Sequence, residues 1–172
     1  MALPASPMAQ PAATEAVAIH PVAAADAAAC RLAARVSTEY FLRTAQLIST
    51  HANGELAMGV VLRAIVAANI GYLDQDVATS VEFGSLDCVP PDDQRRPVSV
   101  MAIAQSLGLP FETARRHVNK LTKAALCKRV KGGIIAPAAT MRGDKEDQAL
   151  LTNMANLRRL YRTLKRAAVT FD

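Results

Sequence analysis

The chain lacks tryptophan and has only three tyrosines and four phenylalanines in 172 residues, so aromatic side chains contribute little to any core. Much of its 51% hydrophobic content is alanine, which favours helix and adds little volume to a core. A chain of this length is long enough for one domain with a hydrophobic core, or for one domain plus tails. We therefore expect one folded unit that is mainly α-helical.

Cysteine and histidine are also scarce, and their spacing fits neither a metal site nor a catalytic one. Three widely separated cysteines, Cys30, Cys88 and Cys127, give no metal-ligand pattern and no disulfide framework, which favours a reducing cytoplasm. The three histidines have no carboxylate or cysteine at catalytic or ligand spacing, and the sequence has no glycine-rich phosphate loop. The sequence therefore predicts neither an enzyme nor a bound metal or cofactor.

Long apolar runs are missing as well. The longest one, Met58 to Ile70, is short for a membrane span and is interrupted by Arg63. The N-terminus lacks the basic start and the apolar core of a signal peptide. We therefore expect a cytoplasmic protein without a membrane span.

Basic residues are few in the first half of the chain, and acidic residues are few in the second. Residues 1–94 hold four arginines against ten acids, a net charge of −6. Residues 95–172 hold sixteen lysines or arginines against five acids, a net charge of +11. Because phosphate neutralisation supplies most sequence-independent affinity for nucleic acid, the second half is suited to a polyanion. The alternative is a basic surface that faces only solvent.

The first half of the chain divides into three segments of different composition. Residues 1–30 are rich in alanine and proline with little bulky apolar content, which predicts a flexible tail. Residues 31–73 contain two helical patterns, of which the second is apolar on nearly every face and is expected in the core or a dimer interface. Residues 74–96 carry Asp, Pro and Gly without periodicity, which predicts a long acidic connection.

A helix, a short glycine-containing turn and a second helix are predicted within residues 97–137. Ser99 is a good N-cap for a helix over 100–107, which a glycine ends. Pro110 suits the start of the next helix, 111–124, because it has no N–H to leave unsatisfied. In this arrangement the second helix can enter a major groove of DNA.

A helical wheel, at about 100° per residue, divides the second helix into an inner and an outer face. Ala114, Val118 and Leu121 fall together on the inner face. Phe111 either touches a thymine methyl or folds onto the core, and His117 is expected to be structural or a phosphate donor rather than a metal ligand. Base contacts come from the N-terminal half of a recognition helix, where Arg can bind guanine and Glu can accept from cytosine. We assign base reading to Glu112, Thr113, Arg115 and Arg116.

Apolar and polar residues alternate over 127–136, which predicts a β-hairpin, called the wing. Gly132 and Gly133 supply the positive φ values that its two-residue turn needs. Pro97-Val98 predicts a further short strand. From residue 115 to residue 131 there are seven lysines or arginines and no acid. We assign contacts with the DNA backbone to polar and basic residues of the helix and the wing: Asn119, Lys120, Lys123, Lys128, Arg129 and Lys131.

A resemblance to a known family rests on three stretches and on the order in which they follow one another: residues 103–109, 113–121 and 125–129. They resemble the winged helix-turn-helix of bacterial transcriptional regulators. Helices before this module and a long helix after it are similar to the MarR and ArsR layouts, although the MarR-type Asp-x-Arg-Asp signature and the ArsR-type Cys-x-Cys site are missing from the sequence. The resemblance implies a sequence-specific regulator that binds double-stranded DNA and whose flanking helices form a dimer.

Residues 144–169 predict a last helix whose apolar residues recur at alternating spacings of four and three. We assign these residues to a homodimer interface: Leu150, Met154, Leu157, Tyr161 and Leu164. In a dimer, two recognition helices would meet successive major grooves about 34 Å apart. The alternative is that this helix and the two N-terminal ones pack within one monomer.

A second class of function is a winged helix used for contact with another protein, without DNA binding. A redox or ligand sensor is also left open, because Cys88 lies in the predicted connection and the apolar helix within residues 31–73 is suited to border a pocket for a small-molecule effector. The acidic neighbour Asp87 disfavours the thiolate form of Cys88, which favours an inert cysteine.

Overall fold

The computed structural model describes residues 24–167, and within them the chain is mainly helical with one small antiparallel sheet, as the sequence predicts. The α-helices are α1 (Ala24–His51), α2 (Leu56–Ile70), α3 (Val77–Glu82), α4 (Val100–Ser106), α5 (Phe111–Lys123) and α6 (Asp144–Arg166). The strands are β1 (Lys128–Val130) and β2 (Gly133–Ile135). Short 3₁₀ helices follow α2 and flank the winged segment: η1 (Gly71–Gln75), η2 (Asp92–Gln94) and η3 (Ala138–Met141).

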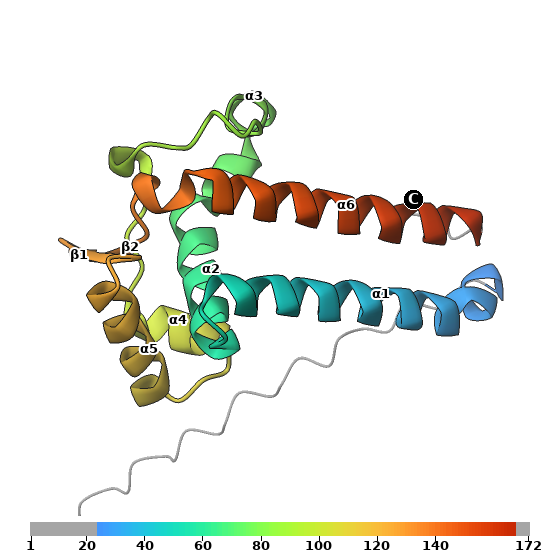
Figure 1. Cartoon of the computed structure of the whole chain (residues 1–172), viewed down its shortest axis with the longest axis horizontal. Helices are drawn as coiled ribbons and strands as arrows, with labels where there is room; N and C mark the ends of the chain where they lie inside the picture. Colours follow the sequence, from blue (N-terminus) through green and yellow to red (C-terminus); the bar gives the residue numbers. More distant parts are fainter. Residues whose placement is uncertain (1–23, 168–172) are drawn as a thin grey trace, which may run out of the picture.

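The long helices α1 and α6 lie side by side and form an arm that extends from a base made of α2, α4, α5 and the two strands (Figure 1). The two helices run antiparallel. At the base, Nε2 of His51 lies 3.0 Å from the carbonyl oxygen of Lys145, and further along the arm the Tyr40 hydroxyl donates to Oδ1 of Asn153 at 3.2 Å. The arm therefore holds the first and last helices together on one side of the base.

Helix α2 is the centre of the base, because it is apolar on most sides and packs against α1, α4, α5 and β2. The largest fully buried apolar side chains of the core come from α2, α4, α5 and β2: Val61, Ile65, Ile103, Val118, Leu121 and Ile134. In the described part of the chain, the segment Leu56–Gln75 is the one that is long and apolar enough to cross a membrane. Within the base, Met58, Val61 and Ile65 of this segment belong to the buried apolar core.

Asn69 is a fully buried polar residue within this apolar helix. Its amide nitrogen donates to the carbonyl oxygens of Arg96 and Ile134, at 2.7 and 3.1 Å, and its Oδ1 accepts from the N–H of Ala136 at 2.9 Å. A buried amide with its hydrogen bonds made fixes the geometry of the chains that it joins. Asn69 therefore ties α2 to the second strand of the hairpin and to the segment that precedes α4.

Helix α1 begins earlier than predicted. It starts at Ala24, inside the segment 1–30 expected to be a flexible tail, so residues 24–30 are helical instead. Alanine is the best helix former, so this alanine-rich composition favours a helix once a neighbouring helix nucleates it. The rest of the expected tail, residues 1–23, and the expected end of the last helix, residues 168–169, lie outside the described residues.

The acidic connection 74–96 contains a helix that the sequence does not predict. Asp76 caps α3, since its Oδ2 accepts from the N–H and the hydroxyl of Thr79 at 2.9 and 2.6 Å. These hydrogen bonds stabilise the ionised carboxylate and lower the pKa of Asp76. The helix buries no residue of its own, so it has no apolar periodicity by which to be found.

Candidate nucleic-acid interface

Helices α4 and α5 form the predicted helix-turn-helix. The Ser99 hydroxyl accepts from the N–H of Ala102 at 3.1 Å, which confirms the predicted N-cap of α4. Gly108 has a φ of +61°, a conformation that glycine adopts without strain, and it turns the chain between the two helices. Pro110 precedes Phe111, the first residue of α5, as the sequence predicts.

The inner face of α5 is buried as predicted. Ala114, Val118 and Leu121 are all fully buried in the base. His117 lies beside them and is also buried, whereas Phe111 keeps 40% of its surface exposed at the start of the helix. Burial on this face fixes the rotation of α5, so the residues on the opposite side of the helix point away from the core.

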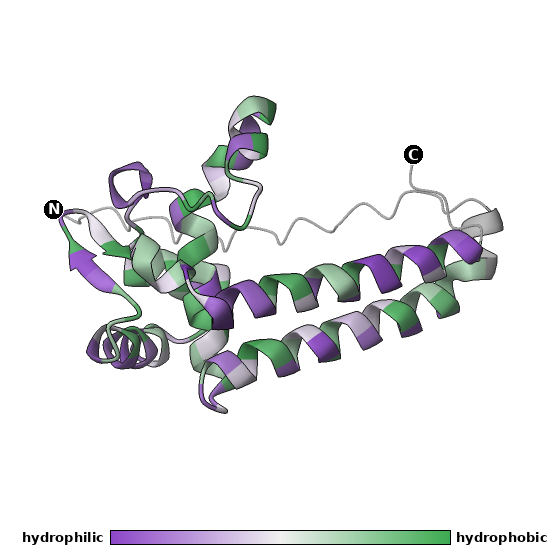
Figure 2. Ribbon diagram, turned by 45° about the horizontal axis from the view of Figure 1, so that its top comes forward, coloured by the Kyte–Doolittle hydropathy of each residue, from purple (hydrophilic) through white to green (hydrophobic). Residues whose placement is uncertain are grey.

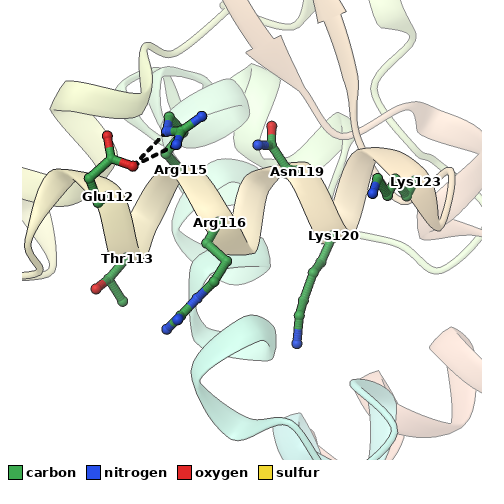
Figure 3. A pocket seen from close by; sticks show the side chains of 7 residues that line it. All are labelled: Glu112, Thr113, Arg115, Arg116, Asn119, Lys120 and Lys123. Carbon is green, nitrogen blue, oxygen red and sulfur yellow. Dashed lines mark hydrogen bonds and ion pairs between the residues drawn. The ribbon is translucent and has the colours of Figure 1, made fainter.

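The outer face of α5 lines an open hollow of about 450 Å³. Seven side chains line it, and they include all four assigned to base reading and three assigned to the DNA backbone: Glu112, Thr113, Arg115, Arg116, Asn119, Lys120 and Lys123. Thr113, Arg116 and Lys120 project from one side of the helix, and Glu112 and Arg115 lie together on another (Figure 3). The structure therefore brings the residues predicted on this helix onto one continuous surface.

Arg115 is bound to Glu112 on the same helix. Its Nε and Nη2 atoms both donate to Oε2 of Glu112, at 2.9 and 2.6 Å. This hydrogen bond and the charge of Glu112 raise the pKa of Arg115, so the guanidinium stays charged. Both side chains are exposed, and exposed ion pairs are weak, so a guanine can compete for the guanidinium.

Two lysines assigned to the DNA backbone are joined to acidic residues far away in the sequence. Lys120 binds Glu55 at 2.7 Å and Lys128 binds Asp92 at 2.6 Å. Each lysine is the main reason why the pKa of its carboxylate partner is lowered. The carboxylates partly neutralise the two lysines in the free protein. A DNA phosphate would therefore have to compete with Glu55 and Asp92 for these lysines.

The hairpin of β1 and β2 is the predicted wing, but its turn differs from the prediction. Lys131 and Gly132 are the turn residues, and Gly133 already pairs with Val130 as the first residue of β2. Gly133 has a φ of +149°, and a Cβ added there would lie 2.5 Å from the carbonyl oxygen of Val98. The predicted strand at 97–98 is thus a single bridge from Val98 to β2, and Gly133 allows its close approach.

The remaining cationic side chains of this surface are open to solvent. Within residues 24–167 no ion pair involves Arg116, Lys123 or Lys131, and all three residues are exposed. Nη2 of Arg129 on β1 donates to Oδ1 of Asn119 on α5 at 2.9 Å, which links the wing to the helix. The sequence does not predict the partners Glu55 and Asp92 or the buried Asn69, because long-range pairs leave no local pattern.

The residues assigned to dimerisation divide into two groups. Leu150, Met154, Leu157 and Tyr161 are all exposed along α6, with Tyr161 at 59%. Leu164 is buried, so it stabilises the packing of α6 within the arm instead of reaching a partner. Helix α1 adds Phe41 and Leu42, which are 66% and 60% exposed, to the apolar surface of the arm.

The cysteines and histidines form no cluster in the described ranges, where no group of three His, Cys, Asp or Glu side chains is arranged to hold a metal ion. Cys30 and Cys88 are exposed free thiols, and Cys127 is buried at the start of the wing. Burial raises the pKa of Cys127 to about 12, so this thiol stays protonated at neutral pH.

Residues 93–140 match the family model of the DeoR-like helix-turn-helix domain, which covers α4, α5 and the wing. No curated protein and no solved structure matches the chain. This match, together with the observed helix-turn-helix and its hairpin, defines a winged helix-turn-helix domain. The domain supports a general role in binding DNA and regulating transcription, and it favours a regulator over an enzyme. It gives no support to the expected MarR- or ArsR-like layout.

Proposed function

We propose that the protein is a cytoplasmic transcriptional regulator that binds double-stranded DNA sequence-specifically as a homodimer. The observation that carries this proposal is the division of α5 into two faces. Ala114, Val118 and Leu121 anchor the helix in the core, while Arg115 and Arg116 remain exposed on the other side. A helix held in this way presents its outer face to the major groove.

Direct base reading falls to the first half of α5. Arg116 has no ion-pair partner among residues 24–167, so it is the side chain most available for a bidentate bond to guanine O6 and N7. Arg115 reaches a second base after it leaves Glu112, and the freed Glu112 carboxylate can accept from cytosine N4. Thr113 projects on the same side as Arg116 and serves as a further contact (Figure 3).

Phosphate contacts fall to the rest of α5 and to the wing, where they position the protein without reading sequence. Lys123 and Lys131 are exposed at the end of the helix and at the tip of the wing. Asn119 and Arg129 add donors between them, and Lys120 and Lys128 join when phosphate displaces their carboxylate partners.

The arm is the proposed dimer interface, with a second copy of the chain as its partner. α1 and α6 pack on each other, yet they leave Leu150, Met154, Leu157 and Tyr161 exposed. Figure 2 shows hydrophobic residues recurring along both helices of the arm. Large exposed apolar patches mark sites of protein contact, and antiparallel helix pairs associate readily into four-helix bundles.

The experiment that tests this function is selection of bound fragments from random duplex DNA, followed by a mobility-shift assay on the enriched site. We expect a near-palindromic site, and we expect Arg116→Ala to weaken binding by about 1–3 kcal/mol and to relax preference at one base position. Arg158→Ala, which removes an exposed arginine from α6, is the matched control and should leave binding unchanged. Absence of any enriched sequence would support a winged helix that contacts protein instead.

A further inference from the structure

A cavity of about 420 Å³ lies where the base meets the arm and shares no lining residue with the α5 surface. Its wall combines α2, the segment 83–90 and the first half of α6. The apolar side chains of this wall include Val66, Ile70, Phe83, Leu86, Leu150 and Met154. A mostly apolar cavity of this size, with a few polar groups, has the dimensions and lining of a small-molecule site.

Arg95 is one of the charged residues that line this cavity. Its side chain is fully buried, and its Nη2 donates to the carbonyl oxygen of Pro90 at 3.0 Å. Its Nε and Nη1 atoms are buried without a hydrogen-bond partner within the described chain. Burial lowers the pKa of Arg95, because a buried charge without a partner is costly. An arginine in this state favours an anion beside it.

The nearest carboxylate does not fill this role. Oδ1 of Asp92 lies 3.8 Å from Nε of Arg95, which is too far for a hydrogen bond. The same oxygen already accepts from the N–H of Ala138 at 2.7 Å, and Oδ2 accepts from Lys128 at 2.6 Å. The other charges of the wall, Arg63 and Glu146, are paired with each other at 2.9 Å. Arg95 is therefore the charge of the cavity that is left without a close partner among the described residues.

We propose that this cavity binds a small carboxylic acid with an apolar body, whose carboxylate pairs with the guanidinium of Arg95. Hydrogen bonds between arginine and carboxylate are charge-assisted, and the ligand carboxylate would accept from Nε or Nη1, the two nitrogens without a partner among the described residues. The apolar body would lie against the leucine, methionine and phenylalanine side chains of the wall. Leu150 and Met154 belong also to the exposed surface of α6, so a second copy docked on the arm would border the mouth of the site.

The site is connected to the wing through Asp92. This carboxylate lies between Arg95 in the cavity and Lys128 on β1. A ligand carboxylate on Arg95 would weaken the attraction between Arg95 and Asp92, and the charge of Asp92 would then be balanced mainly by Lys128. Ligand binding at this site does not depend on the proposed function. An effect of the ligand on DNA affinity does depend on it.

The first test is calorimetric titration of the full chain, without DNA, with 1-naphthoate and with its neutral isostere 1-naphthamide. We expect naphthoate to bind at least about tenfold more tightly than the amide, because the amide lacks the charge that Arg95 attracts. Equal affinities, or no binding of either compound, would overturn the proposal. Because no DNA is present, failure here is distinct from failure of the proposed function.

The second test places a carboxylate in the cavity permanently. Leu86 is 41% exposed, so Leu86→Glu and the matched neutral variant Leu86→Gln should both fold, as checked by thermal melting. We expect Leu86→Glu to lower naphthoate affinity at least about tenfold through its own charge, and Leu86→Gln to keep it within about threefold of wild type. Equal affinity in the two variants would contradict a site built on charge.

Discussion

The base and the arm of this molecule differ in how far they bury their apolar side chains. In the base, the residues that face inward from α2, α4, α5 and β2 are fully buried, as Leu121 is. In the arm, α1 and α6 pack on each other but leave residues such as Leu157 and Phe41 exposed. The base therefore completes its core within one chain, whereas the arm leaves apolar side chains exposed on its surface. This difference underlies the proposal that the base supplies the stability of the chain and the arm its association.

The same substitution in the two regions gives the largest expected difference. Leu121→Ala should lower the free energy of unfolding by about 2–5 kcal/mol, because it leaves a cavity in a fully packed core. Leu157→Ala removes the same atoms from a residue that is 38% exposed and should cost less than about 1 kcal/mol of monomer stability. Urea denaturation at a concentration where the protein is monomeric measures both values. Equal losses would show that the arm is packed like the base.

Association should show the reverse order. Leu157→Glu should weaken dimerisation at least about 100-fold, because a charge without a partner would be buried between the arms. Sedimentation over a range of protein concentrations measures this change. Arg158→Glu introduces the same side chain one position further along, outside the apolar stripe, and should leave the dimer largely intact. A dimer that survives Leu157→Glu would place the interface elsewhere.

The parts of this fold that follow from the sequence are those with local chemical causes. The faces of α5 follow from helical periodicity, the start of α4 follows from the hydroxyl of Ser99, and the hairpin follows from strand alternation and adjacent glycines. Each of these causes acts over a few residues, so one stretch of sequence contains it.

The parts that do not follow depend on contacts between distant residues. Nothing near Lys120 indicates its ion pair with Glu55, and nothing near Asn69 shows that it binds the wing strand. The sequence predicts that Gly133 belongs to the turn, whereas the structure requires glycine there because Val98 lies against its backbone. The buried guanidinium of Arg95 is likewise visible only after α2, α6 and the segment 83–90 are brought together.

The wing offers a smaller effect, which separates phosphate contact from base reading. Lys131→Ala should weaken binding to specific and non-specific DNA alike, and it should reduce the slope of log affinity against log salt by about 1. A mobility-shift or anisotropy series from low to high salt measures that slope. A loss of affinity confined to one DNA sequence would show instead that the wing reads bases.

The smallest expected effect concerns the link between the wing and the acidic connection. Lys128 lowers the pKa of Asp92, so their interaction stabilises the fold above the ordinary pKa of aspartate, and that stability is lost as pH falls through the lowered value. Lys128→Met should therefore reduce stability at pH 6, and its difference from wild type should shrink as the pH falls below about 4. Both side chains are more than a third exposed, so solvent screening keeps the difference under about 1 kcal/mol. Lys131→Met is the control, because Lys131 is a wing residue with no ion pair in the described chain. Lys131 does not pair with Asp92, so this variant should show no such pH dependence.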